Sequence, residues 1–241
     1  MQKISKPILV SALVAVGFGA IGAGATFALF TDRAETTITA EAGKIDISST
    51  LTTIKTYSAK ADTNGTLVDE HQAKYVYEEQ ASSEVQGITR YYFVNGGYVT
   101  YEAGQSGDGT LSIHEMTPGD KVEFSFDIGN GSTVDFKYRM QYQVLNQNYE
   151  LSDGLVTSIQ RGQAQAEEFA GLRSYRTGWN LVQVADAMDA VSFVLELPID
   201  KGNDYQEKTA DIKISFEAVQ GNAAVNDSAE VVVSSVAPAN P

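Results

Sequence analysis

The sequence of 241 residues contains no cysteine, only two histidines and only five prolines. Without cysteine the chain cannot form a disulfide, a thiolate zinc site, an iron–sulfur cluster or a cysteine nucleophile. The two histidines, His71 and His114, are too few for a histidine-rich metal centre. We therefore expect neither a bound metal nor another cofactor.

Basic residues are also scarce, with 17 Lys and Arg against 31 Asp and Glu, which gives a formal net charge of −14. Binding to a phosphate backbone requires clustered lysine and arginine, so nucleic acid is not an expected partner. Hydrophobic residues make up 43% of the chain. This content is enough for a packed core in one sizeable domain or two small ones.

Charged residues are absent between Lys6 and Asp32, where the chain reads PILVSALVAVGFGAIGAGATFALFT. A basic start, an apolar middle and small residues near the end are typical of a secretory signal peptide. The run is also long enough for a transmembrane anchor, but the glycines in its second half favour the signal peptide. We predict a signal peptide over residues 1–28, cleaved between Ala28 and Leu29, and hence a secreted protein.

Alternation of apolar and polar residues with a period of two is the main pattern of the remaining chain and predicts β-strands. Strands over 122–128 and 134–144 flank the Gly/Asn-rich loop 129–132 and predict an antiparallel hairpin. Further alternating stretches lie at 45–54, 191–197 and 212–218. They predict an all-β fold, a jelly-roll-like β-sandwich over residues 43–221, with 222–241 as a last strand or a frayed tail.

Two segments differ from this pattern and are expected as insertions in the β-sandwich. Residues 57–112 are polar and rich in tyrosine, and Asn95-Gly96-Gly97 within them predicts a hairpin turn. Residues 160–190 contain the helical candidates, one short helix over 164–172 and a candidate second helix over 181–188. The expected fold is thus a sandwich with a short helical excursion and a Tyr-rich insertion.

The tyrosines of the stretch 57–112 allow two interpretations. They could form a carbohydrate-binding or adhesive face, because aromatic rings with a polar end are common at binding surfaces. Tyrosine is also common on half-buried strands, so we favour a role in packing. The aromatic residues concerned are Tyr75, Tyr77, Tyr91, Tyr92, Phe93, Tyr98 and Tyr101.

Catalytic motifs are missing from the sequence, which has no H-E-x-x-H, no G-x-S-x-G elbow and no Walker loop. The G-x-G-x-x-G letters at 17–22 lie in the signal peptide without a preceding strand, so they do not indicate a dinucleotide site. His114 and Glu115 are more simply an exposed pair in a connecting loop than an acid–base pair. The loops 62–65 and 106–109 lack the bidentate Glu of a calcium loop. We therefore expect that the protein is not an enzyme.

Several local motifs occur in an order that is typical of one protein family. The signal peptide ends in G-A-G-A-T-F-A-L-F-T-D over 22–32, and T-A-E-A-G-K-I-D-I follows over 39–47. Further along the chain are M-T-P-G-D over 116–120, I-G-N-G-S over 128–132 and I-S-F-E-A-V-Q over 214–220. In these motifs and their order, the chain resembles the TasA/camelysin family of secreted matrix proteins.

The resemblance implies a jelly-roll subunit that polymerises with its own copies into extracellular biofilm matrix fibres, at the cell surface or in the matrix. It also implies cleavage by a SipW-type signal peptidase and makes other matrix proteins candidate partners. Structural turns are implied at Pro118, Gly119 and Asp120, and at Asn130 and Gly131. Some camelysin relatives are described as metallopeptidases, but no zinc motif is present here, so that activity is not transferred.

Family members polymerise by donor-strand exchange, which would make residues 29–42 the strand that completes the sheet of the next subunit. A donor strand must be extended, free of proline and apolar on one side. A head-to-tail contact of this kind need not close and so gives filaments. The alternative is a monomeric cell-surface adhesin or carbohydrate-binding β-sandwich that uses the Tyr-rich stretch. The donor-strand residues that share one parity are Phe30, Ala34, Ile38, Ala40 and Ala42.

Overall fold

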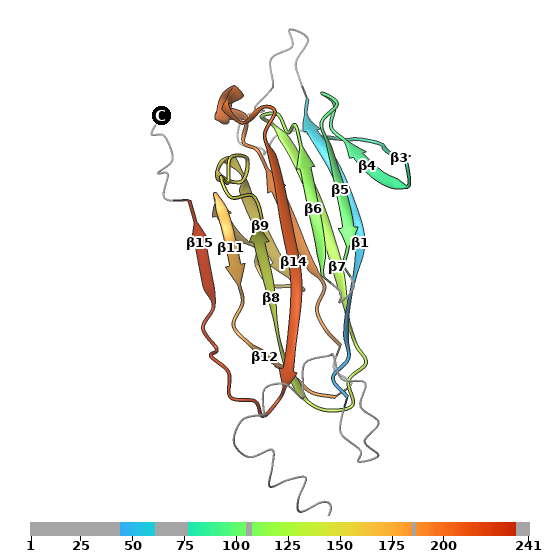
Figure 1. The fold of residues 1–241 in the computed structure, drawn as a ribbon, viewed down its shortest axis with the longest axis vertical. Helices are drawn as coiled ribbons and strands as arrows, with labels where there is room; N and C mark the ends of the chain where they lie inside the picture. The colour runs from blue at the N-terminus through green and yellow to red at the C-terminus, as the bar shows by residue number, and fades with distance from the viewer. Residues whose placement is uncertain (1–43, 61–76, 105–107, 185–186, 235–241) are drawn as a thin grey trace, which may run out of the picture.

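The computed structural model describes residues 44–60, 77–104, 108–184 and 187–234. Within these ranges, fifteen β-strands and two short 3-10 helices are present, and the strands form two antiparallel sheets. The sheets pack face to face with their strands along the long axis of the molecule, as Figure 1 shows. The all-β sandwich expected from the period-two alternation is therefore confirmed.

The smaller sheet contains β1 (Ile47–Ala59), β2 (Tyr77–Glu79), β7 (Asp120–Asn130), β9 (Val156–Arg161), β10 (Glu167–Ala170) and β13 (Val191–Glu196). Their spatial order is β10-β9-β13-β7-β1-β2. The register of β1 against β7 shifts between Leu51 and Thr53, which is a β-bulge. Because the bulge changes the parity of the strand, Leu51 and Ile54 both pack against the core.

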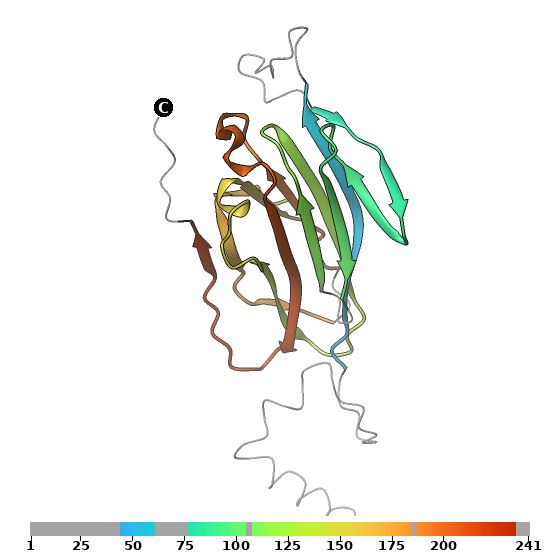
Figure 2. The ribbon, with the colours of Figure 1, turned by 45° about the horizontal axis from the view of Figure 1, so that its top comes forward.

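The larger sheet contains β3 (Ser82–Val85), β4 (Ile88–Tyr92), β5 (Tyr98–Ala103), β6 (Gly109–His114), β8 (Phe136–Val144), β11 (Leu172–Arg176), β12 (Asn180–Val182), β14 (Thr209–Gln220) and β15 (Glu230–Val233). Their spatial order is β15-β11-β8-β14-β6-β5-β4-β3, and β12 pairs with β8 beside β11. The 3-10 helices are η1 (Ser152–Gly154) and η2 (Ile199–Tyr205). Figure 2 shows the molecule turned so that one end of the sandwich comes forward.

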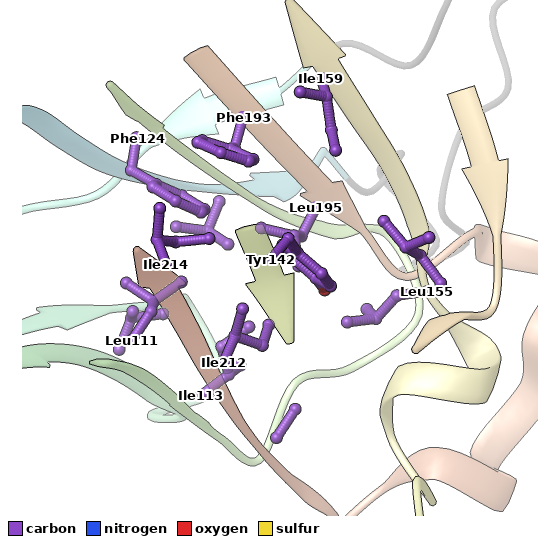
Figure 3. Close-up of a cluster of buried hydrophobic side chains, with 14 of the residues drawn as sticks. Leu111, Ile113, Phe124, Tyr142, Leu155, Ile159, Phe193, Leu195, Ile212 and Ile214 are labelled. Atoms are coloured by element: carbon purple, nitrogen blue, oxygen red, sulfur yellow. The ribbon is translucent and has the colours of Figure 1, made fainter. Parts of the chain in front are cut away.

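The core lies between the sheets and is built from the inward-facing residues of both (Figure 3). Phe124 on β7 and Phe193 on β13 are direct cross-strand partners, and their rings stack with centroids 4.8 Å apart. Tyr142 reaches Phe193 from β8 in the opposite sheet, with centroids 6.3 Å apart. Burial of such aromatic side chains is the main favourable contribution to a β-sandwich of this size.

The hairpin expected over 122–144 is wrong, because β7 and β8 belong to different sheets. β7 pairs with β1 and β13, whereas β8 pairs with β14, β11 and β12. The loop between β7 and β8 carries the chain from one sheet to the other. Alternation correctly predicted the buried face of each strand, but it carries no information about which strand lies beside it.

The helices expected over 164–172 and 181–188 are also wrong. The first range forms β10 and the start of β11, and β12 (Asn180–Val182) occupies the start of the second. Gly162, directly after β9, and Gly171, between β10 and β11, adopt positive φ angles of 52° and 61° where the chain reverses. Tertiary pairing with β9, β8 and β15 therefore overrides the helix propensity of this segment.

Part of the Tyr-rich stretch 57–112 is built into the larger sheet. β3, β4, β5 and the first residues of β6 lie in this stretch, and Val99 and Leu111 are fully buried in the core. The hairpin turn at 95–97 is confirmed, since it connects the antiparallel strands β4 and β5. The tail contains a last strand, β15, over Glu230–Val233.

The predicted signal peptide 1–28 and donor segment 29–42 lie outside the described residues. Within the described ranges, no helix is long and apolar enough to cross a membrane.

Gly97 follows the β4–β5 turn at a position where a side chain has no room. A Cβ at Gly97 would lie 2.3 Å from the backbone carbonyl oxygen of Glu115. We expect Gly97→Ala to lower the free energy of unfolding by about 2 kcal/mol, because strands β5 and β6 must move apart. Urea denaturation would measure this loss. Val94→Ala is the control, since Val94 is 67% exposed and should change little; equal stabilities of the two variants would contradict the prediction.

Candidate assembly site

The described chain enters the sandwich at the end where β1 and β8 begin and β7 and β14 end, which we call the lower end, as in Figure 1. The turn after β7 holds the entering chain by main-chain and side-chain bonds. The Gly131 N–H donates to the Asp46 carbonyl at 2.8 Å, and the Asp46 N–H donates to Ser132 Oγ at 2.9 Å. The Asn130 side chain accepts from the Ser132 N–H at 3.0 Å. The first described residues of the chain are therefore fixed to the lower end.

Half of β14 lacks a neighbour on one side at this same end. Residues Thr209–Ile214 pair with β6, whereas Ser215–Gln220 pair only with β8 on the opposite side. In Figure 1, β14 continues towards the lower end beyond the start of β6. Within the described ranges, no strand pairs with the β6 side of Ser215–Gln220. We call this stretch the open edge of β14.

Burial along β14 falls beyond the start of β6 at Gly109. The inward-facing residues Ile212 and Ile214 are 0% and 1% exposed, whereas Phe216 and Ala218 are only half-buried. The Phe216 ring still reaches Phe126 on β7, with centroids 6.0 Å apart. The core is therefore covered less completely at the lower end, in the half of the larger sheet where one more strand would extend it.

The smaller sheet has a matching open stretch at the lower end. β2 pairs with Tyr57–Ala59 only, so Ile47–Lys55 have β7 as their sole strand partner within the described ranges. The inward-facing Leu51 in this half is half-buried, in contrast to Thr56 in the paired half, which is fully buried. The open edges of both sheets thus lie at the end where the described chain begins.

The turn at Thr117–Asp120 lies at the opposite end of the sandwich and is closed by its own hydrogen bonds. Gly119 has a positive φ of 90°, and the Asp120 N–H closes the turn on the Thr117 carbonyl at 2.9 Å. Asp120 Oδ2 accepts from the Thr117 N–H at 2.8 Å and from Thr117 Oγ1 at 2.9 Å, and Oδ1 accepts from Ser58 Oγ at 2.5 Å. Burial raises the pKa of Asp120, although these hydrogen bonds favour its charged form.

A cavity of about 610 Å³ lies beside this turn. Asp120 lines it, but both carboxylate oxygens already accept hydrogen bonds from Ser58 and Thr117. Within the described ranges, no three His, Asp or Glu side chains are grouped as metal ligands would be. The other lining side chains include Lys60, Glu78, Asn95, Asn203 and Gln206. The Asp120 carboxylate thus joins β7 to Ser58 of β1, and we call this hydrogen-bonded contact the β1–β7 clasp.

The tyrosines of the stretch 57–112 that the structure describes have two kinds of surroundings. Some, such as Tyr101, pack against the core, whereas Tyr98 stacks between side chains of neighbouring strands. Tyr101 packs on the core, and burial raises its pKa. Tyr98 stacks on His114 of β6 with centroids 4.6 Å apart, and the Arg90 guanidinium of β4 lies 4.7 Å from its centroid. Because β4 and β6 flank β5 on opposite sides, these two groups cover opposite faces of the Tyr98 ring. A sugar ring would have to displace one of them, so we do not advance the adhesin alternative.

The His114–Glu115 pair is divided by the end of β6. His114 is the last residue of that strand and stacks on Tyr98, while Glu115 adopts a positive φ of 57° in the following loop. Of the two calcium-like loops, 62–65 lies outside the described residues. In the other, Asp108 forms an ion pair with Lys213 at 2.7 Å. His114 is therefore engaged by Tyr98, and Asp108 is engaged by Lys213.

The predicted donor residues and the cleavage site at Ala28 and Leu29 lie outside the described residues, so the candidate site consists of the open edges of β14 and β1. Sequence reasoning missed its residues Phe216 and Ala218, although it predicted their strand. The feature that could have identified them is the difference in length between neighbouring strands. β14 has 12 residues and its neighbour β6 only 6, so part of β14 must extend beyond β6.

No family model and no curated protein matches this chain. Among solved structures, the enzymatically active domain of bacteriophage CBA120 tailspike protein 4 is similar with 12% identity and a TM-score of 0.25, over 58% of this chain and 18% of that chain. The secreted serine protease VesC from Vibrio cholerae is similar with 12% identity and a TM-score of 0.20, over 59% of this chain and 30% of that chain. The chain spans less than a third of either structure, and neither likeness carries a functional argument.

Proposed function

We propose that the protein is a secreted, non-enzymatic structural subunit that polymerises by donor-strand exchange into extracellular matrix fibres. The observation that carries the proposal is the open edge of β14 beside half-buried Phe216 and Ala218. An added strand there would gain main-chain hydrogen bonds along Ser215–Gln220 and cover the apolar side chains beneath.

The donor in this proposal is the N-terminal segment of another copy. After the expected cleavage, about 15 residues precede the described fold, and an extended segment of that length reaches roughly 50 Å. It leaves the sandwich beside the Asn130–Ser132 turn, at the end where the acceptor edges lie. One subunit can therefore offer a donor and an acceptor at the same time, which is the requirement for a heterologous, open-ended contact.

The negative net charge of the chain should delay assembly after secretion. A formal net charge of −14 makes separate copies repel one another at low ionic strength. Salt or lower pH should weaken this repulsion and speed filament growth. Filament growth rates that are the same at low and high salt would remove this part of the proposal.

Negative-stain electron microscopy of the chain beginning at Leu29, incubated at high concentration, tests the function. We expect regular filaments from the wild-type chain and none from Ile38→Pro, because proline removes a main-chain donor within the donor strand. Ile38→Val is the matched control, since it keeps the β-branched shape and should form filaments normally. Monodisperse particles from the wild-type chain under varied salt and pH would refute the proposed function.

A further inference from the structure

β15 (Glu230–Val233), at the margin of the larger sheet in Figure 1, exposes apolar side chains on both of its faces. Val231, Val232 and Val233 are 45%, 42% and 45% exposed, so the strand does not pack against the core. It is held by pairing with β11, by the Arg176–Glu230 ion pair at 2.5 Å, and by the Ser234 N–H, which donates to the Gly171 carbonyl at 2.7 Å. Within the described ranges, no strand pairs with its outer edge.

The outer strands at three ends of the sheets, β2, β3 and β10, carry acidic residues that discourage pairing between copies. β10 has Glu167 and Glu168, β2 has Glu78 and Glu79, and β3 has Glu84. In a chain with a net charge of −14, such edges repel a second copy. β15 differs in that three of its four residues are valines. Its acidic residue, Glu230, is paired with Arg176, as Glu79 is with Lys55 and Glu167 is with Arg161.

We propose that β15 is a second contact surface, which pairs antiparallel with β15 of another copy around a twofold axis at Val232. The Ser234 N–H points towards β11, so by alternation Val232 points its main-chain groups the same way. Val231 and Val233 then point theirs outward. An axis at Val232 places Val231 opposite Val233 of the second copy, and these two positions can exchange hydrogen bonds.

The charges also agree with this register. Glu230 lies opposite Ser234 of the second copy, so no two carboxylates face each other, and each Glu230 keeps its own Arg176 partner. The larger sheets of the two copies then form one continuous sheet. The apolar faces of the valines, exposed in the single copy, are flanked by the equivalent valines of the other.

This contact deepens the proposed function and rests on it for its effect on fibres. A strand of four residues binds weakly when two single copies meet. Because a twofold contact closes on itself, it cannot extend a filament, but it can join two filaments side by side. Repetition at every subunit turns the weak contact into a strong one. The expected product is a paired or bundled fibre.

The absence of cysteine allows a direct test by disulfide cross-linking. In the proposed register the Val232 Cα atoms of the two copies face each other at about 4.5 Å, within the range that a disulfide spans. Val232→Cys should therefore give a disulfide-linked dimer under mild oxidation. Val231→Cys alone should give at least about tenfold less, since its two copies are two residues out of register.

The register has a second, independent readout. An equimolar mixture of Val231→Cys and Val233→Cys should give the mixed dimer, while neither variant alone cross-links well. Dimer yields that are similar for Val231→Cys, Val232→Cys and the mixture would indicate random collision and overturn the proposal. No dimer from Val232→Cys would overturn it as well.

The experiment separates this contact from donor-strand exchange. Cross-linking is measured both in filaments and in concentrated Ile38→Pro chain, where a missing filament does not prevent β15 from pairing. Within filaments, Val232→Lys should abolish bundling and leave single filaments, because it places two ammonium groups opposite each other. Val232→Thr, which keeps the β-branched shape, should bundle. Bundles that persist in Val232→Lys would refute the β15 contact while leaving the fibre function intact.

Discussion

Replacing Ala218 by lysine should abolish filament formation while leaving the subunit folded. Ala218 faces inward on the open edge of β14, and it is half-buried in the single subunit. An incoming strand would enclose the new ammonium group, which cannot be desolvated without a partner. Before assembly, the lysine can extend its ammonium group to water along its aliphatic stem, so the free energy of unfolding should change by less than about 1 kcal/mol.

The matched control for this substitution is Ser215→Lys, on the same open edge but on the outward face of β14. It adds the same charge and the same side chain in a position that stays in water after a strand is added. Sedimentation should show the polymerised fraction reduced at least about tenfold in Ala218→Lys and unchanged in Ser215→Lys. An equal loss in both variants would mean that added charge, and not the inward face of the edge, controls assembly.

Replacing Asp120 by alanine should lower the free energy of unfolding by about 3 kcal/mol. The substitution leaves three donors at the β1–β7 clasp without their acceptor: Ser58 Oγ, the Thr117 N–H and Thr117 Oγ1. Asp120 is only 2% exposed, so water cannot easily replace the carboxylate. Urea denaturation would measure the loss, with Asp127→Ala on the same strand as an exposed control. If Asp120→Ala lowered the free energy of unfolding by less than Asp127→Ala, the stabilising role of Asp120 would be refuted.

The pH dependence of the Asp120→Asn variant provides a separate test. Burial raises the pKa of Asp120 in the folded protein above its unfolded value, so the folded state binds this proton more tightly. The wild-type protein therefore gains stability relative to Asp120→Asn as the pH falls through the raised pKa, and loses that advantage as the pH rises. We would measure the free energy of unfolding of both proteins by urea denaturation at pH 7 and at about pH 4. The excess stability of the wild type over Asp120→Asn should be larger at about pH 4 than at pH 7. A larger difference at pH 7 would contradict the cause assigned here.

The faces of the strands could be predicted from the sequence, but their partners could not. Phe124 and Phe126 were correctly expected on one face of a strand, and the structure buries both in the core. Their neighbour was expected to be the next strand along the chain. Their neighbours are instead β1 and β13, each more than 60 residues away. The period of a strand depends on local geometry alone, whereas pairing depends on the packing of the whole sandwich.

The two helices were mispredicted for a related reason. Ala164, Glu167 and Glu168 favour a helix by intrinsic propensity, which contributes only a few tenths of a kcal/mol per residue. Pairing of β10 with β9, and the positive φ angles at Gly162 and Gly171, determine the actual conformation. Partial burial of Phe169 against the core adds to the same outcome.

The candidate site was predicted in part. The turns at 117–120 and 130–132 could be recognised from their Pro, Gly and Asn residues, whose backbone preferences are local. The open edge of β14, the proposed acceptor, could not be recognised, because it arises from the difference in length between β14 and β6. Likewise, the clasp joins Asp120 to Ser58 across 62 positions of the chain, a pairing that turn composition does not encode.

The length and direction of the open edge have a mechanical consequence for a fibre. The strands run along the long axis of the molecule in Figure 1, and the open edge of β14 follows that axis over six residues, Ser215–Gln220. A donor strand paired there would be pulled parallel to its own length when the fibre is stretched. All of its main-chain hydrogen bonds would then carry the load together, instead of opening one after another as in a peeled hairpin. A joint loaded in shear resists more force than the same bonds opened in sequence, so the fibre would gain tensile strength without any covalent link between subunits.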